Sequence, residues 1–159
     1  MFTKICYDGP IAEQYHSLNK QLDALLTGET DYIANLSNAS ALLNQFLTNI
    51  NWVGFYILQG EELVLGPFQG LPACVRIPTG RGVCGTAVAQ KETIVVKDVH
   101  EFPGHIACDA ASQSEIVIPL IKNGEVIGVL DIDSPVVNRF SQEDQDGLEL
   151  FVNTLLLHL

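Results

Sequence analysis

The sequence predicts an α/β domain of the α+β type, in which helices pack on the faces of a central antiparallel sheet. Three observations lead to this fold class. Apolar residues recur at helical spacing near both ends of the chain, short β-branched and aromatic runs lie between, and Asn123-Gly124 marks a hairpin. With 159 residues and 47% hydrophobic composition, the chain suits a single domain, 1–159, with a proper core.

Two helices are expected before the sheet, over 8–26 and 31–48. The first should bury Ile11, Tyr15, Leu18, Leu22 and Leu25. The second should turn Ile33, Leu36, Leu43, Phe46 and Leu47 inward. A further helix should close the chain from Ser141, because Asp144 three residues later completes a capping-box pattern.

The aromatic run 51–58 predicts the first strand, and 62–68 returns as the second. Because side chains alternate along a strand, Trp52 and Tyr56 share one face, where they either pack in the core or line a ligand site. Further elements are expected at 74–78 (strand), 83–90 (short helix) and 93–96 (strand), followed by a long loop over 98–113.

The hairpin around Asn123-Gly124 leaves two registers open. A two-residue loop places Glu115 opposite Ile132, which keeps it away from the later acids. A three-residue loop places Glu115 opposite Asp131, which gathers it with Asp131 and Asp133 on one face. Three inward acids would be costly without a purpose.

The net charge and the length of the apolar runs limit the partners and the location that can be expected for this protein. A net charge of −11 repels phosphate backbones and anionic membrane surfaces, so nucleic acid and membrane are not expected as partners. No secretory leader is visible, and no apolar run is long enough to span a bilayer. A cytoplasmic protein is therefore expected.

Three of the four cysteines, Cys74, Cys84 and Cys108, lie in the loop-rich stretch 71–115. Without a C-x-x-C or H-x-x-x-H pair their spacing disfavours zinc, and in a reducing compartment cysteines that pair are more often catalytic or redox-sensing than structural. Reduction of an oxidised sulfur requires an attacking thiolate, a proton donor and a resolving thiol. Carboxyl groups with raised pKa values can donate the proton, and the candidates are Glu115, Asp131 and Asp133.

Two cysteines compete for the role of nucleophile. Cys84 follows Arg81 at an expected helix start, which favours a lowered thiol pKa. Cys108 lies in the long loop near His105, where it could meet a substrate and then a partner thiol. The residues alone leave this choice open.

The motifs of this chain resemble those of a known family. They are NWVGFY, LGPFQGLPACVRIPTGRGVCGTA, HIACD, EIVIPL and VIGVLDIDSP. Together they resemble the free methionine-R-sulfoxide reductases, which are stand-alone GAF domains, over about residues 30–152. The three cysteines at this spacing are the most specific part of the resemblance, because a GAF-like fold alone hosts many functions.

The resemblance implies an oxidoreductase for free methionine R-sulfoxide, of the kind used against oxidative stress, with no metal or organic cofactor. It implies that Cys108 attacks the substrate, that Cys74 resolves the sulfenic acid by forming a disulfide, and that thioredoxin reduces this disulfide. Cys84 would be an auxiliary thiol. Related domains often pair through their terminal helices, so a homodimer is compatible with the resemblance.

The resemblance also assigns the substrate contacts. Glu115, Asp131 and Asp133 would bind the amino group and activate the sulfoxide, while Trp52 and Tyr56 would hold the methyl-sulfur end. Two rival functions remain: a ligand-sensing GAF module and a thiol redox sensor without turnover. A sensing module is expected to accompany an effector domain, for which this chain has no room.

Overall fold

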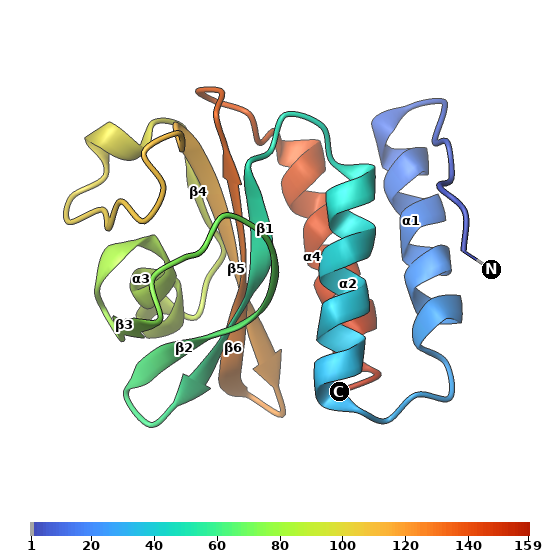
Figure 1. The fold of residues 1–159 in the computed structure, drawn as a ribbon, viewed down its shortest axis with the longest axis horizontal. Coiled ribbons are helices and arrows are strands. Elements are labelled where there is room, and N and C mark those ends of the chain that lie inside the picture. Colours follow the sequence, from blue (N-terminus) through green and yellow to red (C-terminus); the bar gives the residue numbers. More distant parts are fainter. Residues whose placement is uncertain (1) are drawn as a thin grey trace.

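The computed structural model describes residues 2–159, which form one six-stranded antiparallel sheet with helices on both of its faces (Figure 1). The strand order is β3-β2-β1-β6-β5-β4. The strands are β1 (Trp52–Gln59), β2 (Glu62–Gly70), β3 (Arg76–Pro78), β4 (Ile94–Val96), β5 (Ser114–Lys122) and β6 (Glu125–Ser134). The helices are α1 (Ile11–Leu26), α2 (Tyr32–Phe46), α3 (Gly82–Gln90), the 3₁₀ turn η1 (Val99–Glu101) and α4 (Gln142–Leu156). The predicted fold class is confirmed.

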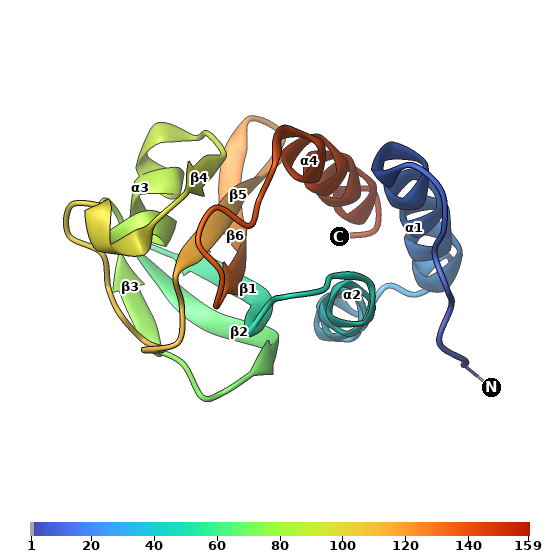
Figure 2. The same cartoon turned by 90° about the horizontal axis from the view of Figure 1, so that it is seen from above.

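Helices α2 and α4 cover one face of the sheet, and α1 packs on their outer side (Figure 2). The core between these helices and the sheet is built from apolar side chains, among them Tyr15, Leu36, Phe55, Leu130 and Phe151. The hydroxyl of Tyr15 donates to Asp144 Oδ1 at 2.7 Å, which joins α1 to α4. A buried polar tip thus keeps a partner, as burial requires.

The start of α4 confirms the predicted capping box. The Ser141 hydroxyl accepts from the backbone N–H of Asp144, and the Asp144 carboxylate accepts from the backbone N–H of Ser141. Arg139 Nη1 donates to the same carboxylate at 3.0 Å. The backbone N–H groups of Ser141 and Asp144, which have no partner within the helix, are therefore each satisfied by the side chain of the other residue.

One predicted core residue is wrong: Ile33 is 66% exposed. The first turn of α2 instead buries Asn35, whose side-chain amide donates to the carbonyls of Glu29 and His158 at 3.2 and 3.0 Å. Residues two apart on a helix point about 200° apart. Burying Asn35 therefore turns Ile33 toward solvent.

The hairpin between β5 and β6 closes with a two-residue loop, because Lys122 pairs with Glu125. Asn123 and Gly124 both have positive φ, 53° and 79°. This is the conformation that the right-handed twist of a tight hairpin requires, and Asn-Gly adopts it at low cost.

Neither expected register of this hairpin is correct. The register shifts by one residue just before Ile121, so Glu115 lies opposite Asp133 and not opposite Ile132 or Asp131. A β-bulge that adds one residue to β6 has this effect. Glu115, Asp131 and Asp133 therefore share a face of the sheet. The bulge brings them together, and not the length of the loop.

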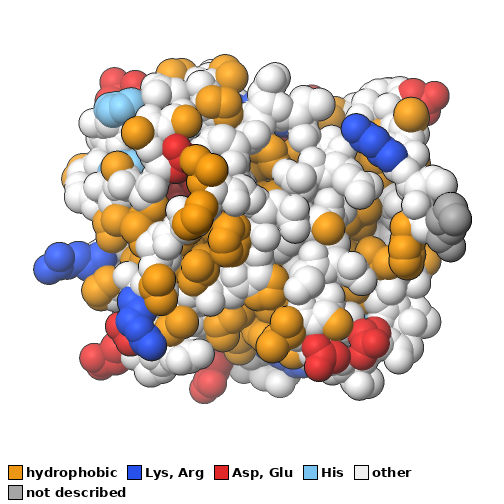
Figure 3. All heavy atoms as spheres, in the orientation of Figure 1, with side chains coloured by type: hydrophobic (Ala, Val, Ile, Leu, Met, Phe, Trp, Pro, Cys, Tyr) orange, Lys and Arg blue, Asp and Glu red, His pale blue; other side chains and the backbone are white. Residues whose placement is uncertain are grey.

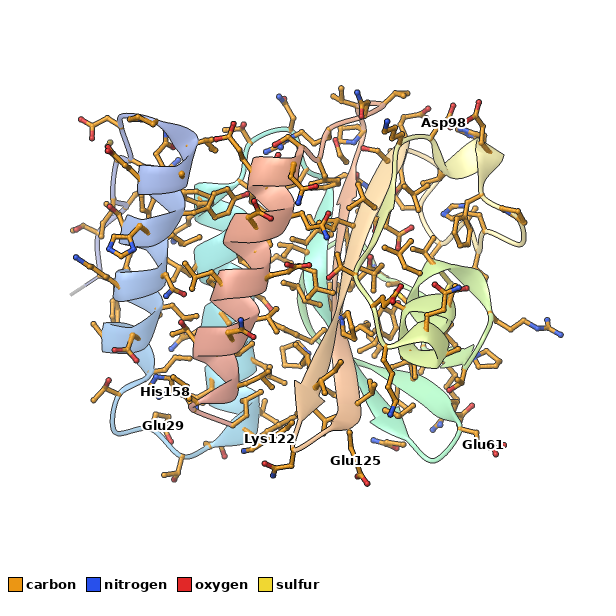
Figure 4. All side chains as sticks on the ribbon, turned by 180° about the vertical axis from the view of Figure 1, so that it is seen from behind. Glu29, Glu61, Asp98, Lys122, Glu125 and His158 are labelled. Carbon is orange, nitrogen blue, oxygen red and sulfur yellow. A yellow bond between two sulfur atoms is a disulfide. The ribbon has the colours of Figure 1, made fainter. Side chains whose placement is uncertain are left out.

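The second face of the sheet carries α3 and the long connection between β4 and β5, while β3 and β4 form the two edges of the sheet (Figure 1). The charged residues Glu61, Lys122 and Glu125 lie at one end of the sheet, and Asp98 lies at the other (Figure 4). In the view of Figure 3, apolar side chains form a band over the middle of the surface, and most acidic ones lie toward its edges. Within residues 2–159, no helix combines the length and apolar character needed to cross a bilayer.

Candidate active site

A pocket opens on the second face of the sheet, between α3, the segment after β2 and the long connection before β5. Its volume is about 550 Å³ when the space at its open mouth is included. The floor is formed by β1, β5 and β6, which contribute Trp52, Tyr56, Glu115, Asp131 and Asp133. The walls include Cys84 from α3 and Cys108 from the long connection.

The three predicted acids meet on this floor. Strand pairing places Glu115 opposite Asp133, and Asp133 is also opposite Trp52 of β1. Asp131 lies two residues before Asp133 and therefore on the same face. Glu115 and Asp131 are 5% and 6% exposed, and Asp131 Oδ1 is buried without a hydrogen-bond partner. An unpaired buried acceptor of this kind is costly and points to a group that the pocket is built to receive.

Burial makes these carboxyl groups weak acids. It raises the pKa of Glu115 from 4.5 to about 8, with a further contribution from the charge of Asp133. The pKa values of Asp131 and Asp133 are also raised well above their ordinary range, first by burial and then by neighbouring carboxylates. At neutral pH the cluster can therefore hold protons that it can donate.

Cys84 contributes a buried thiol to the same cluster. Its Sγ lies 4.0 Å from Glu115 Oε1, and the side chain is 4% exposed. Burial, followed by the charges of Asp131 and Glu115, raises its pKa well above the ordinary value. The expectation that a helix start and Arg81 would lower this pKa is wrong, because desolvation among carboxylates outweighs a partial helix charge.

Cys74 and Cys108 are joined by a disulfide, with their Cα atoms 5.7 Å apart. Cys74 lies between β2 and β3, and Cys108 lies between η1 and β5. The bond therefore connects two loops at the mouth of the pocket. Cys84 and the exposed Cys6 remain free thiols.

The predicted aromatic pair lines the pocket. Trp52 and Tyr56 stack with ring centroids 5.8 Å apart, and Trp52 also stacks with Phe68 at 5.1 Å. Their polar tips hold the loop that carries Cys74. Trp52 Nε1 donates to the carbonyl of Leu71 at 3.2 Å, and the Tyr56 hydroxyl donates to the carbonyl of Cys74 at 2.9 Å.

His105 was noted near Cys108 in the sequence without being assigned to the site, and three further pocket residues of the long connection were missed: Ile106, Asp109 and Ser112. His105 Nε2 lies 3.6 Å from Glu115 Oε2, and burial lowers the pKa of this histidine. Ile106 packs against Gly82, which is the first residue of α3 and has a φ of 61°. A Cβ at this position would lie 3.1 Å from the Ile106 side chain. Their closeness to Cys108 in the sequence could have identified all four residues as candidates for the site.

Known proteins are similar to this chain in sequence and in fold. The GAF domain family matches residues 22–159. A protein of Escherichia coli (strain K12) named free methionine-R-sulfoxide reductase is 59% identical over 143 residues, which is 90% of this chain and 87% of that protein.

Two solved structures extend the likeness to three dimensions. The structure of fRMsr of Staphylococcus aureus in its reduced form is 53% identical, with a TM-score of 0.90 over 100% of this chain and 99% of that one. The free methionine-R-sulfoxide reductase from Neisseria meningitidis in complex with its substrate is 42% identical, with a TM-score of 0.94 over 99% and 95%. This chain belongs to the GAF-domain proteins and, among them, to the free methionine-R-sulfoxide reductases.

Proposed function

We propose that this chain reduces free methionine R-sulfoxide to methionine, with Cys108 as the nucleophile and Cys74 as the resolving thiol. The observation that supports this most strongly is the disulfide between these two residues at the mouth of a pocket floored by protonatable acids. It is the bond that would remain after one turnover.

The first step is attack of the Cys108 sulfur on the substrate sulfur. The acid cluster transfers a proton to the sulfoxide oxygen. The resulting hydroxyl then moves from the substrate sulfur to the Cys108 sulfur as the bond between the two sulfurs breaks, which releases methionine and leaves Cys108 as a sulfenic acid. In the second step the Cys74 thiol displaces this oxygen as water and the disulfide forms. The substrate sulfur is reduced by two electrons, and the two thiols supply them.

The cluster has two tasks, which its three carboxyl groups can share. One of them, ionised, holds the substrate ammonium, while another keeps the proton that the sulfoxide oxygen needs. A methionine sulfoxide inside a peptide has an amide in place of the ammonium and gains no such ion pair. This supports selectivity for the free amino acid.

Trp52 and Tyr56 would hold the methyl-sulfur end of the substrate, since their stacked rings offer the apolar wall of the pocket. Cys84 is better suited to donate a hydrogen bond to Glu115 than to exchange disulfides. Its pKa is raised, and the thiolate is the form that attacks.

The activity test is direct. The reduced protein is incubated with dithiothreitol and free methionine R-sulfoxide, and methionine is measured. We expect turnover by the unmodified chain and none by Cys108→Ser. Full activity in Cys108→Ser would refute the nucleophile, and no methionine from the unmodified chain would favour a redox sensor or a ligand-sensing module.

Thioredoxin is proposed as the reductant of the disulfide. Cys74→Ser should still turn over with dithiothreitol, which can reduce a sulfenic acid directly, but should fail with thioredoxin and its reductase, which need a disulfide. Equal activity of this variant with both reductants would contradict the resolving role of Cys74.

A further inference from the structure

We propose that Asn51 is a positioning residue for Cys108: its side-chain amide pins the Asp109–Ser112 turn to the sheet, so that Cys108 moves between substrate and Cys74 from a fixed pivot. This inference rests on the proposed roles of the two cysteines. It concerns a residue that neither touches the sulfurs nor lines the pocket.

Asn51 is itself fixed to the floor of the site. It directly precedes β1, and its backbone N–H donates to the carbonyl of Asp133 at 2.9 Å. The position of its side chain is therefore set by the same strand that carries the acid cluster.

The side-chain amide of Asn51 uses both of its N–H groups on one turn. Nδ2 donates to Asp109 Oδ2 at 2.9 Å and to Ser112 Oγ at 3.1 Å. Within the turn, Asp109 Oδ1 accepts from the backbone N–H of Ala111 at 2.8 Å. Asp109 is thereby held through both carboxylate oxygens, and it is the residue that follows Cys108.

This arrangement leaves Asn51 Oδ1 buried without a partner. Reversing the amide would aim this oxygen at the Asp109 carboxylate, and two acceptors repel one another. The unpaired oxygen is thus the cost of keeping both N–H groups on the turn.

The chain on the other side of Cys108 is held much less firmly. Over 106–108, the described structure shows no backbone hydrogen bond, and the nearest one runs from His105 N–H to the carbonyl of Phe102 at 3.2 Å. One flank of Cys108 is therefore pinned by hydrogen bonds, while the other is held only by side-chain packing, such as that of Ile106 on Gly82, and can shift more easily. Such a hinge lets one sulfur reach two positions in turn.

The test begins with Asn51→Asp, which keeps the shape and places a carboxylate against Asp109. Reduced protein is treated with hydrogen peroxide, which oxidises the Cys108 thiolate to a sulfenic acid and is itself reduced to water. Cys74 then condenses with the sulfenic acid. We expect disulfide formation to slow by roughly tenfold or more, because the turn loses hydrogen bonds to a charged group, and sulfenic acid trapped by a 1,3-dione to accumulate on Cys108.

A charge exchange separates positioning from simple destabilisation. In the double variant Asn51→Asp/Asp109→Asn, an amide again faces a carboxylate, and we expect most of the rate to return. Asn19→Asp is the matched control, because Asn19 also has a buried unpaired Oδ1 but lies in α1, away from the pocket. It should leave the rate of disulfide formation unchanged.

The inference is overturned if Asn51→Asp forms the disulfide at the normal rate, or if the charge exchange restores nothing while both variants keep a native thermal transition. Peroxide replaces methionine sulfoxide in this experiment. A protein that fails to reduce the sulfoxide but shows the slowing and the rescue would reject the proposed substrate and retain the role of Asn51.

Discussion

The two faces of the sheet are built from the same strands but carry opposite chemistry. Along β6, Leu130 and Ile132 enter the core under α2 and α4, while the alternating Asp131 and Asp133 enter the pocket. In β1, Phe55 points to the helices and its neighbour Tyr56 to the pocket. A strict alternation of side chains thus separates a face that stabilises the fold from one that serves chemistry.

The buried acids of the pocket face reduce stability at neutral pH. Burial raises the pKa values of its three acids and of Cys84, which means that their ionised forms are disfavoured in the folded protein. Apolar burial supplies the compensating stability, mainly in the core under α2 and α4 and also in the smaller cluster around Val83, Val117 and Val129 on the pocket side. Substitutions in the core under the helices should therefore lower stability more than activity, and substitutions in the pocket should lower activity more than stability.

The largest change in stability is expected from the helical face. Phe55 is fully buried, and Phe55→Ala should lower the free energy of unfolding by about 3–5 kcal/mol through lost burial and a cavity. Where the variant is folded, its KM for methionine R-sulfoxide should be normal, since the side chain points away from the pocket. Urea unfolding and steady-state kinetics measure the two quantities, and Phe55→Leu should lose much less stability. A raised KM in folded Phe55→Ala would break the separation of the faces.

Asp133→Asn should show the reverse pattern. Hydrogen bonds to charged groups contribute about 1.5–3 kcal/mol, so loss of one to the substrate ammonium should raise KM roughly 10- to 100-fold. The free energy of unfolding should stay equal or rise, because a neutral amide escapes the cost of a buried charge. Glu61→Gln removes the same charge from an exposed turn at the far end of the sheet and is the control. An unchanged KM in Asp133→Asn would refute ammonium recognition by this residue.

Stability should fall as pH rises through the neutral range. Glu115 has a pKa of about 8 in the folded protein against 4.5 ordinarily, so between these values the folded state binds more protons than the unfolded one. Its contribution is complete below pH 4.5 and is lost as pH rises through about 8.

The slope from this one group should reach up to about 1.4 kcal/mol per pH unit, and Asp131 and Asp133 act in the same direction. Urea unfolding of the disulfide form across this range measures it. Glu115→Gln should flatten the curve. A free energy of unfolding that increases over the same range, or an equal slope in the variant, would contradict the buried acid cluster.

Most of the fold was predictable because the helices and strands follow local periodicity and turn chemistry. The capping box at Ser141 and the Asn123-Gly124 turn are set by neighbouring residues, and the structure contains both. The hairpin register was not predictable, since a bulge depends on packing of β6 against β1 and β5 and has no signature in the residues of the loop.

The identity of the site residues was predictable from sequence motifs. Their protonation states were not, because these depend on burial. Sequence reasoning selected the residues that meet in the pocket, but it assigned Cys84 a lowered pKa. The sequence shows that Arg81 is near, whereas only the fold shows that Glu115 and Asp131 surround the thiol. Asn51 was missed for a related reason: its partners Asp109 and Ser112 are distant in sequence and reach it only through the long connection.

The smallest effect is expected at the one predicted core position that the fold exposes. Ile33 is 66% exposed, so Ile33→Ala should change the free energy of unfolding by less than about 0.5 kcal/mol. Leu36→Ala, one turn later on the same helix and fully buried, should cost about 2–5 kcal/mol. Urea unfolding of the pair measures the difference. Equal losses would mean that a partner surface covers Ile33 in solution, because an exposed isoleucine gives up almost no burial when it is shortened.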